Sequence, residues 1–271
     1  MAVKRFFSTI YGIDTGLRPG GWNMAFDRSL MQAVLDGRFH ERFGKGCCLW
    51  RFYGWEPSAV TLGYNQDVSS IDSSRCRDEG IDIVRRPTGG RAVFHAEEFT
   101  YSFLAETGEQ NAVMYRVVHE TIMLALRELG IQAEFCRSTL DEARARGVPV
   151  PCFTVSARHE LQVGGKKLVG SAQRRSRDVL LQHGSLPLTG RHRDISRLIS
   201  FGDGETERAT RLEMERKTVS LQEVLGYIPR YDTLVGLMQR ALFLQSGTRM
   251  VMLDPGALEP FLQTAPDPSK S

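Results

Sequence analysis

The chain has 271 residues, of which 41% are hydrophobic and 25% are charged, a composition typical of a folded protein with a hydrophobic core. Its formal net charge of +3, from 35 lysines and arginines against 32 acidic residues, argues against a nucleic-acid-binding protein. No apolar run approaches the roughly 20 residues that span a bilayer, and the basic first residues lack the apolar core of a signal peptide. We therefore expect a cytoplasmic protein with no membrane partner.

Five cysteines are spread along the chain: Cys47, Cys48, Cys76, Cys136 and Cys152. Their number is odd, and they form neither a Cys-x-x-Cys pair nor the cysteine and histidine spacing of a zinc site. This pattern favours free thiols in a reducing compartment, and we expect no metal site.

The first half of the chain alternates helical and extended patterns. Asn23 stands where a helix N-cap belongs, the residues after it are apolar at helical spacing, and Gly37 is a natural stop. Strands are expected at 47–55, 58–64 and 82–86, a short helix at 72–80, and an extended stretch at 92–106.

The second half begins with the strongest helix signal of the sequence, over residues 112–130. A strand should follow at 131–136, and Gly164-Gly165, between "HELQV" and "KKLVGSAQRR", is typical of a β-hairpin turn. A further strand is expected at 178–190, after which the pattern becomes charged and helical.

Strands mixed with helices and antiparallel hairpins indicate an α+β protein, with one or more mixed, largely antiparallel sheets flanked by helices. Repeated βαβ units and internal repeats are not evident. The simplest organisation is a single domain over residues 1–255, followed by a C-terminal tail over 256–271.

The sequence "RRPTGGRAVF", which begins at Arg85, joins a turn signal to an unusual concentration of hydrogen-bond donors. A turn flanked by surface arginines is the simpler interpretation. Alternatively, the arginines, Thr88 and the bare backbone of Gly89 and Gly90 could receive a carbonyl or a phosphate. The loop is neither a P-loop nor a dinucleotide-binding Gly-x-Gly-x-x-Gly turn.

Few side chains elsewhere are candidates for chemistry. Cys152 lies in the loop "PVPCFTV", where a thiol could be accessible, although a loop cysteine is more often structural or idle. If Lys166 points to solvent, Lys167 must point inward, unless it only snorkels back to water. His95 and His183 are each more typical of hydrogen-bonded structural histidines than of bases. No Gly-x-Ser-x-Gly elbow supports a serine triad.

In this order, the motifs "NMAFD", "RRPTGGRAVFHAEEFTYSF", "PCF", "GGKKLVGSAQ" and "LLQHGSLPL" resemble the biotin/lipoate protein ligase superfamily. Within it the chain is most similar to the cysteine-dependent octanoyltransferases of lipoate biosynthesis. The resemblance covers roughly residues 20 to 190 and implies a fold of the biotin/lipoate ligase catalytic-domain type. The chain departs from the pattern at Arg28, where the family often has Glu, and at Ala96, where it often has Asp.

The resemblance also implies a reaction: transfer of an octanoyl group from octanoyl-acyl carrier protein to a lysine of a lipoyl domain, such as that of glycine cleavage H protein. It makes Cys152 the acyl acceptor and Lys167 its catalytic partner, with no cofactor, because exchange between thioesters needs no ATP. The substrate-binding residues that it implies are Arg85, Arg86, Thr88, Gly89, Gly90, His95, Gly170, Ser171, Ala172 and His183.

Three alternatives remain at this stage. An ATP-dependent lipoate-protein ligase would use Lys167 to bind an acyl adenylate and would leave Cys152 without a role. An amidotransferase would move octanoyl or lipoyl groups between two lipoyl domains through the same cysteine. A non-catalytic protein would keep the arginine and glycine loop only to hold an acyl or lipoyl ligand.

Overall fold

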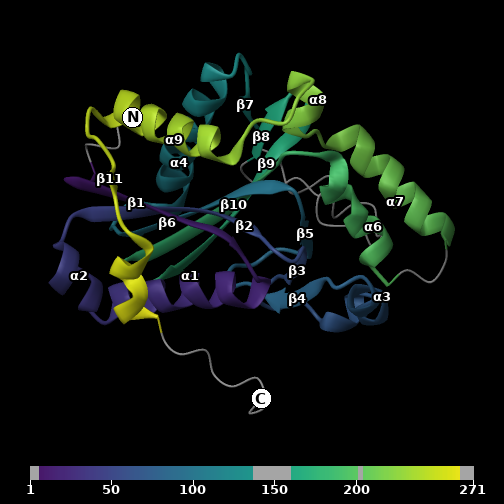
Figure 1. Ribbon diagram of the computed structural model, residues 1–271, viewed down its shortest axis with the longest axis horizontal. Coiled ribbons are helices and arrows are strands. Elements are labelled where there is room, and N and C mark those ends of the chain that lie inside the picture. The colour runs from purple at the N-terminus through teal and green to yellow at the C-terminus, as the bar shows by residue number, and fades with distance from the viewer. Residues whose placement is uncertain (1–5, 137–159, 201–203, 263–271) are drawn as a thin grey trace, which may run out of the picture.

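A computed structural model of the chain describes residues 6–136, 160–200 and 204–262. It contains a large sheet with helices on both faces and a small sheet beside it (Figure 1). The predicted α+β class with mixed sheets is confirmed. Most expected elements are present, with ends that differ by a few residues.

The large sheet has eight strands in the order β11-β1-β2-β6-β10-β9-β8-β7. β1 pairs in parallel with β2 and β11, and all other neighbours are antiparallel. The expected hairpin turn at Gly164-Gly165 joins β8 to β9, and both glycines have positive φ. The strand bounds are β1 Thr9–Arg18, β2 Cys47–Trp55, β6 Glu98–Glu106, β7 Glu134–Cys136, β8 Glu160–Val163, β9 Lys166–Ser176, β10 Val179–Pro187 and β11 Val251–Met252.

The small sheet has the order β4-β3-β5, with bounds β3 Ala59–Leu62, β4 Asp82–Arg85 and β5 Val93–His95. The stretch expected to be extended over 92–106 is therefore divided between two sheets, because β5 pairs with β3 whereas β6 pairs with β2 and β10. The break falls at Glu97, whose φ of 48° interrupts the extended backbone.

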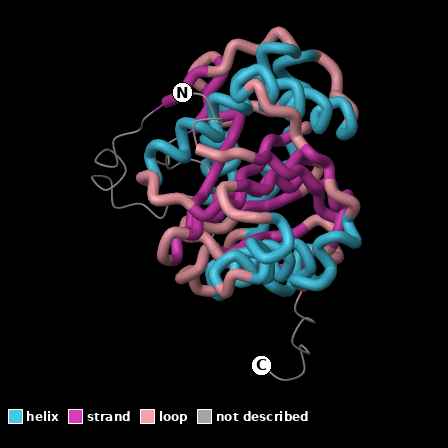
Figure 2. The backbone as a smooth tube through the Cα atoms, turned by 90° about the vertical axis from the view of Figure 1, so that its left-hand side faces the viewer, coloured by secondary structure: helices cyan, strands magenta, loops and turns pink. Residues whose placement is uncertain are grey.

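Helices cover both faces of the large sheet, as Figure 2 shows. α1 (Gly20–Leu35) and α2 (Arg38–Phe43) lie on one face, and α4 (Asn111–Glu128) and α9 (Tyr231–Ser246) lie on the other. The remaining helices are α3 Ser73–Asp78, α6 Ile195–Leu198, α7 Gly204–Lys217 and α8 Leu221–Leu225, with 3-10 turns η2 Val68–Ser70, η3 Gly190–Asp194 and η4 Pro255–Phe261.

The expectation that Asn23 caps the first helix is wrong. α1 begins at Gly20 with Pro19 as its N-cap residue, and Asn23 lies inside the helix, fully buried. Its amide nitrogen donates to the carbonyl oxygens of Arg18 at 3.1 Å and Gly54 at 3.0 Å. Asn23 therefore joins α1 to the ends of β1 and β2 instead of capping a helix.

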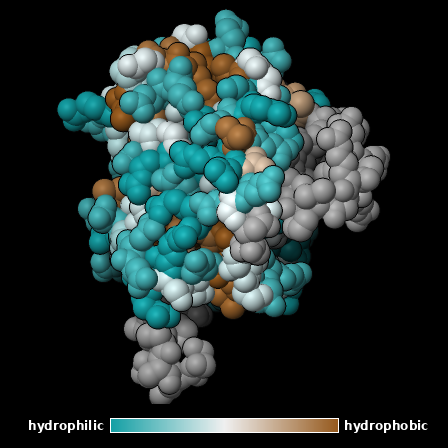
Figure 3. Space-filling model, turned by 90° about the vertical axis from the view of Figure 1, so that its right-hand side faces the viewer, coloured by the Kyte–Doolittle hydropathy of each residue, from teal (hydrophilic) through white to brown (hydrophobic). Residues whose placement is uncertain are grey.

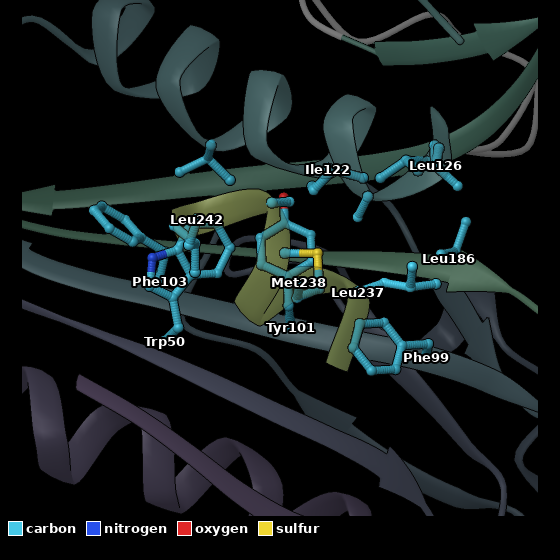
Figure 4. Close-up of a cluster of buried hydrophobic side chains, with 14 of the residues drawn as sticks. Trp50, Phe99, Tyr101, Phe103, Ile122, Leu126, Leu186, Leu237, Met238 and Leu242 are labelled. Atoms are coloured by element: carbon cyan, nitrogen blue, oxygen red, sulfur yellow. The ribbon is translucent and has the colours of Figure 1, made fainter. Parts of the chain in front are cut away.

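The largest hydrophobic core lies between the sheet and the α4–α9 layer (Figure 4). Aromatic side chains from β2 and β6, such as Trp50 and Phe103, face aliphatic side chains such as Ile122 from α4 and Met238 from α9. A second core, beneath α1 and α2, includes Leu258 and Phe261 of η4. Residues 256–261, which were expected to begin a tail, thus contribute to this core.

The surface is largely polar on the side that Figure 3 shows, where hydrophobic side chains gather mainly towards the top. Among the described helices, none combines the length and the hydrophobicity that a membrane crossing requires.

Candidate active site

One face of the β9–β10 pair carries several of the candidate residues. Ala172 lies opposite His183, and the next pair, Ser171 and Gly184, faces the other way because side chains alternate along a strand. A register shift in the β8–β9 pairing brings Lys167 opposite Gln162, on the face away from Leu161 and the α4 core. Lys167, Gly170, Ala172 and His183 therefore share one face, which we call the platform.

Lys167 points inward, and its side chain is only 9% exposed. The ammonium nitrogen lies 2.6 Å from Oε1 of Glu160, which is also buried. Lys166, its neighbour, turns the other way and donates to the carbonyl oxygen of Glu215 at 3.0 Å. The platform therefore holds a buried ammonium group at a fixed place. Burial disfavours such a charge, and the carboxylate of Glu160 compensates for this.

The loop between β4 and β5, residues 86–92, is held in place by the two arginines that begin its sequence motif. Arg86 donates to the carbonyl oxygens of Thr61 at 3.0 Å, Gly89 at 2.8 Å and Arg91 at 2.7 Å. Arg85 donates to three carbonyl oxygens of residues 63–66. Most guanidinium donors thus bind backbone carbonyl oxygens. The two arginines therefore hold the loop in its conformation, which agrees with the simpler interpretation of the motif as a turn.

Two glycines let this loop approach its neighbour closely. A Cβ atom on Gly63 would lie 1.7 Å from the carbonyl oxygen of Gly90, and Gly90 itself has a φ of 99°. The loop therefore needs glycine at position 63 as well as at Gly90, which belongs to the sequence motif.

Thr88 connects the loop to the platform. Its hydroxyl oxygen lies 2.6 Å from Nε2 of His183, and Nδ1 of His183 lies 3.7 Å from Oδ2 of Asp27. Burial lowers the pKa of His183 despite the nearby carboxylate, so the ring is neutral at pH 7. With its proton on the side of Asp27, the ring accepts a hydrogen bond from the Thr88 hydroxyl.

Asp27 belongs to a buried ion pair with Arg51 that sequence reasoning missed. Nη1 of Arg51 lies 2.9 Å from Oδ1 of Asp27, and both side chains are 1% exposed. The guanidinium also donates to Thr15 at 2.9 Å and lies over the ring of Tyr53, 3.8 Å from its centroid. Burial, the largest single influence, would raise the pKa of Asp27, but the charge of Arg51 and the hydrogen bonds with His183 and Arg51 together hold this pKa below its ordinary value.

Both members of this pair left a signal in the sequence. Asp27 ends the motif "NMAFD", and Arg51 is the one charged residue in the apolar strand "CCLWRFYGW". A charge in a fully buried strand requires a partner. The sequence could have raised that question, although it could not have identified the partner.

His95 supports the loop from the small sheet. Its Nε2 lies 2.8 Å from the hydroxyl of Thr61, which also accepts from Arg86, and its Nδ1 lies 2.7 Å from Glu98. The ring stacks on Trp55 at 4.1 Å between centroids. His95 is thus engaged on both nitrogens beneath the loop.

Ser171 lies on the face of the sheet opposite to the platform. Its hydroxyl is 2.7 Å from the Tyr101 hydroxyl and 2.9 Å from Nε2 of His119, and Tyr115 donates to its carbonyl oxygen. A Cβ atom on Gly184 would lie 2.6 Å from the Ser171 hydroxyl oxygen, so glycine leaves room for this cluster. The side chain of Ser171 therefore points away from the platform, although its sequence neighbours Gly170 and Ala172 belong to it.

Cys152, the expected nucleophile, lies outside the described residues. Among the described cysteines, burial raises the pKa of Cys47, Cys48 and Cys76, which opposes formation of a thiolate. Cys136 is partly exposed. Within the described residues, no group of three or more histidine, cysteine, aspartate or glutamate side chains is arranged to hold a metal ion.

Residues 19–243 match the family of the lipoyl protein ligase A/B catalytic domain. The chain is 38% identical to octanoyltransferase LipM of Symbiobacterium thermophilum over 220 residues, which are 79% of this chain and 78% of that protein. It is 33% identical to octanoyltransferase LipM of Geobacillus kaustophilus over 223 residues, 78% of this chain and 77% of that one. The chain therefore belongs to the lipoyl protein ligase A/B catalytic domain family.

Solved structures agree on the fold. A bipartite lipoate protein ligase from Thermoplasma acidophilum, studied with its E2 lipoyl domain, superimposes with a TM-score of 0.72 at 17% identity, covering 96% of this chain and 95% of that one. A lipoate-protein ligase A bound with ATP gives a TM-score of 0.67 at 20% identity, covering 92% and 90%. The expected catalytic-domain fold is thus confirmed.

Proposed function

We propose that this protein, an octanoyltransferase of lipoate biosynthesis, takes its acyl group from octanoyl-acyl carrier protein and delivers it to a lysine of a lipoyl domain, such as that of glycine cleavage H protein. Cys152 carries the group between them as a thioester. The observation that supports this most is the buried ammonium of Lys167, held by Glu160 on the same face of the sheet as His183. The sequence relatives named above, which are octanoyltransferases, also support this proposal.

The first half-reaction needs a thiolate. A thiol with a pKa near 8.5 is only about 3% ionised at pH 7, and an ammonium that lowers the pKa to about 7 stabilises the thiolate by roughly 2 kcal/mol. Lys167 supplies such a charge. The Cys152 sulfur forms a bond to the donor's acyl carbon, the bond from that carbon to the carrier's sulfur breaks, and the carrier leaves as a thiol.

The second half-reaction transfers the acyl group to nitrogen. The acceptor lysine, whose pKa is about 10.4, must lose a proton before its nitrogen attacks the Cys152 thioester. The new C–N bond replaces the C–S bond, and the Cys152 thiol is regenerated. A neutral Lys167 takes the first proton as general base, and the second proton that the nitrogen loses on forming the amide goes to the departing Cys152 sulfur. Glu160, whose Oε1 lies 2.6 Å from Nζ of Lys167, holds the Lys167 side chain at this place.

The platform and its loop provide the surroundings for this exchange. In the proposal, Arg85, Arg86, Thr88, Gly89 and Gly90 cover the acyl group, whereas Gly170, Ala172 and His183 lie beneath it. His95 supports the loop from beneath through its hydrogen bond with Thr61. Ser171 acts from the opposite face of the sheet, where its hydroxyl contacts that of Tyr101. No cofactor is required, because the donor is already a thioester. We propose further that the chain forms one domain, which includes the core residues Leu258 and Phe261 beyond the expected boundary at 255, and that it acts in the cytoplasm.

The test is the intact mass of the protein after incubation with octanoyl-acyl carrier protein and no ATP. We expect the mass of one octanoyl group to be added to the wild type and to Cys136→Ala, but not to Cys152→Ala. Lys167→Gln should form the adduct at least about tenfold more slowly, as expected for loss of a catalytic group. Adding a lipoyl domain should remove the adduct and acylate the acceptor.

Other outcomes would select the alternatives. An absolute requirement for ATP in transfer from free lipoate would identify a ligase. Efficient transfer from acylated H protein, but not from acyl carrier protein, would identify an amidotransferase. Binding of the acyl donor without any adduct would indicate a non-catalytic protein. Labelling that persists in Cys152→Ala would reject the assignment of the nucleophile.

A further inference from the structure

A cavity of about 350 Å³ opens between α1, the β4–β5 loop and the end of β9. Its lining includes the side chains of Arg28, Arg85 and Arg174 together with Tyr64, and no aspartate or glutamate. We call this cavity the arginine pocket. Its lining includes Arg86 and Pro87 of the loop that covers the platform, and Arg85 at the end of β4, so the pocket adjoins the proposed active site.

The arginines of this pocket have no ion-pair partner in the described part of the chain, although Asp27 acts electrostatically on Arg28 and Asp67 interacts in the same way with Arg85. Arg28 donates to the carbonyl oxygen of Arg85 at 3.0 Å, and Arg174 donates to that of Pro87 at 2.9 Å. In those described residues, none of Arg28, Arg85 and Arg174 forms an ion pair. A guanidinium has five N–H donors, so both Arg28 and Arg174 keep several for an anion.

Tyr64 helps to orient the guanidinium of Arg174. The guanidinium of Arg174 lies over the Tyr64 ring, 4.7 Å from its centroid. Together with the hydrogen bond to Pro87, this contact leaves little freedom to the long side chain, so less entropy is lost when an anion binds. Planar guanidinium groups held in this way suit the oxygen atoms of a phosphate.

A larger cavity of about 640 Å³ has the opposite character. Its lining includes four carboxylates, those of Glu56, Glu79, Glu97 and Glu98, and a single arginine. Repulsion by these groups would disfavour a bound anion there. Of these two cavities, only the arginine pocket therefore suits a negatively charged group.

The position of the pocket relative to Lys167 indicates which anion it takes. Arg174 follows Lys167 by seven residues on β9, a span of roughly 23 Å at about 3.3 Å per residue. Arg174 lies on the platform face, since it contacts the β4–β5 loop as His183 does. A ligand that bridges the two places must be long, with its anionic group far from its reactive carbonyl.

We propose that the arginine pocket binds the phosphodiester of a phosphopantetheine arm whose acyl thioester lies at Lys167. This inference rests on the proposed function, because it assumes a thioester donor. Two sources share this chemistry, a carrier protein with a covalently attached arm and an acyl coenzyme A. The carrier protein is the proposed donor, and the acyl coenzyme A is the comparison in the test.

The test compares donors that differ only in phosphate: octanoyl-pantetheine and octanoyl-4′-phosphopantetheine. Octanoyl-acyl carrier protein and octanoyl-coenzyme A are measured alongside them, and kcat/KM is determined for formation of the acyl-enzyme. In the wild type, the phosphate should raise kcat/KM about tenfold or more, as hydrogen bonds to a charged group imply. Arg174→Gln and Arg28→Gln should each remove most of this gain and leave octanoyl-pantetheine within about twofold of the wild type.

Arg175→Gln is the matched control. Arg175 is the next residue of β9, and its guanidinium likewise binds backbone carbonyl oxygens, those of Thr107 and Glu109, but away from the pocket. This substitution should leave the gain from phosphate unchanged. A higher kcat/KM for the carrier protein than for coenzyme A, with both falling in Arg174→Gln, would identify the source of the arm.

The failures of the two proposals are distinguishable. A wild type that acylates equally well with and without the phosphate would overturn the pocket assignment alone. Equal losses for all four donors in Arg174→Gln would also overturn it, because they would show that Arg174 only holds the loop through Pro87. If no donor acylates the wild type, the proposed function itself fails.

Discussion

At the scale of single residues, the site depends on a buried ion pair that touches no proposed reacting atom. Asp27 accepts from Arg51 and from Ser102 at 3.0 Å, and it faces His183, which in turn contacts Thr88. Placing two charges in a protein interior is costly unless each is well paired. This pair helps to fix the histidine that joins the platform to the loop.

Replacing Asp27 by asparagine keeps the shape of the side chain but leaves Arg51 charged and unpaired in the core. We expect the free energy of unfolding at pH 7 to fall by about 3 kcal/mol or more, measured by urea denaturation. The pKa of Asp27 is lowered in the folded protein, so its contribution is present at neutral pH and is lost as the pH falls below about 4. The difference between variant and wild type should therefore shrink in acid.

The control for this substitution is Asp36→Asn, which removes an exposed ion pair with Arg38. Exposed pairs contribute little because water and salt screen them. We expect its unfolding midpoint to stay close to that of the wild type. An equal loss in both variants would contradict a special role for the buried pair.

At the scale of elements, the site is assembled from a helix, a loop and a hairpin that are distant in sequence. The hairpin presents the platform, α1 supplies Asp27, and the β4–β5 loop closes over His183 through Thr88. The loop reaches this place because the backbones near Gly63 and Gly90 touch without intervening side chains. Close packing between two backbone segments thus helps to place the loop.

Gly63→Ala tests this close approach. The added methyl group would lie 1.7 Å from the Gly90 carbonyl oxygen, so the loop must move. We expect a loss of about 1–3 kcal/mol in unfolding free energy, as for overpacking, and slower acyl transfer with every donor. Gly21→Ala, inside α1 where nothing lies within 4 Å of the new atom, should leave transfer intact and stabilise the helix by up to about 1 kcal/mol. Normal transfer in Gly63→Ala would show that the loop need not be fixed.

At the scale of the whole molecule, the end of the described chain closes the core beneath α1. β11 pairs with β1 at the edge of the large sheet, and η4 then places Leu258 and Phe261 beside Phe39 of α2. Leu258 is fully buried. The fold therefore depends on residues from both ends of the described sequence.

Leu258→Ala should lower the unfolding free energy by about 2–5 kcal/mol, because it leaves a cavity in the second core. Leu212→Ala, at a side chain that is 62% exposed on α7, serves as the control and should change it by less than about 0.5 kcal/mol. Thermal or urea unfolding measures both. Similar, small changes in the two variants would show that η4 is not part of the cooperative core.

The sequence by itself determined the local elements. Periodic apolar residues predicted α4, Gly164-Gly165 predicted the hairpin turn, and the ordered motifs predicted the family. These signals are local, because helix and strand periods and turn residues act within a few positions. The alternation of side chains along a strand predicted an inward Lys167 only on the condition that Lys166 points to solvent. The structure does place Lys167 inward, but Lys166 is partly buried and bonded to Glu215, and a register shift in the β8–β9 pairing sets the face of Lys167. The roles of Cys152 and Lys167 in the reaction stay predictions.

Only the tertiary structure decided which distant residues meet. It divided the stretch 92–106 between two sheets, moved Asn23 from a cap to an interior contact, and placed Ser171 behind the platform. It also paired Asp27 with Arg51 and Lys167 with Glu160. The reason is physical: strand register, and the need to give every buried charge a partner, are settled by the packing of the whole chain and not by its neighbours in sequence.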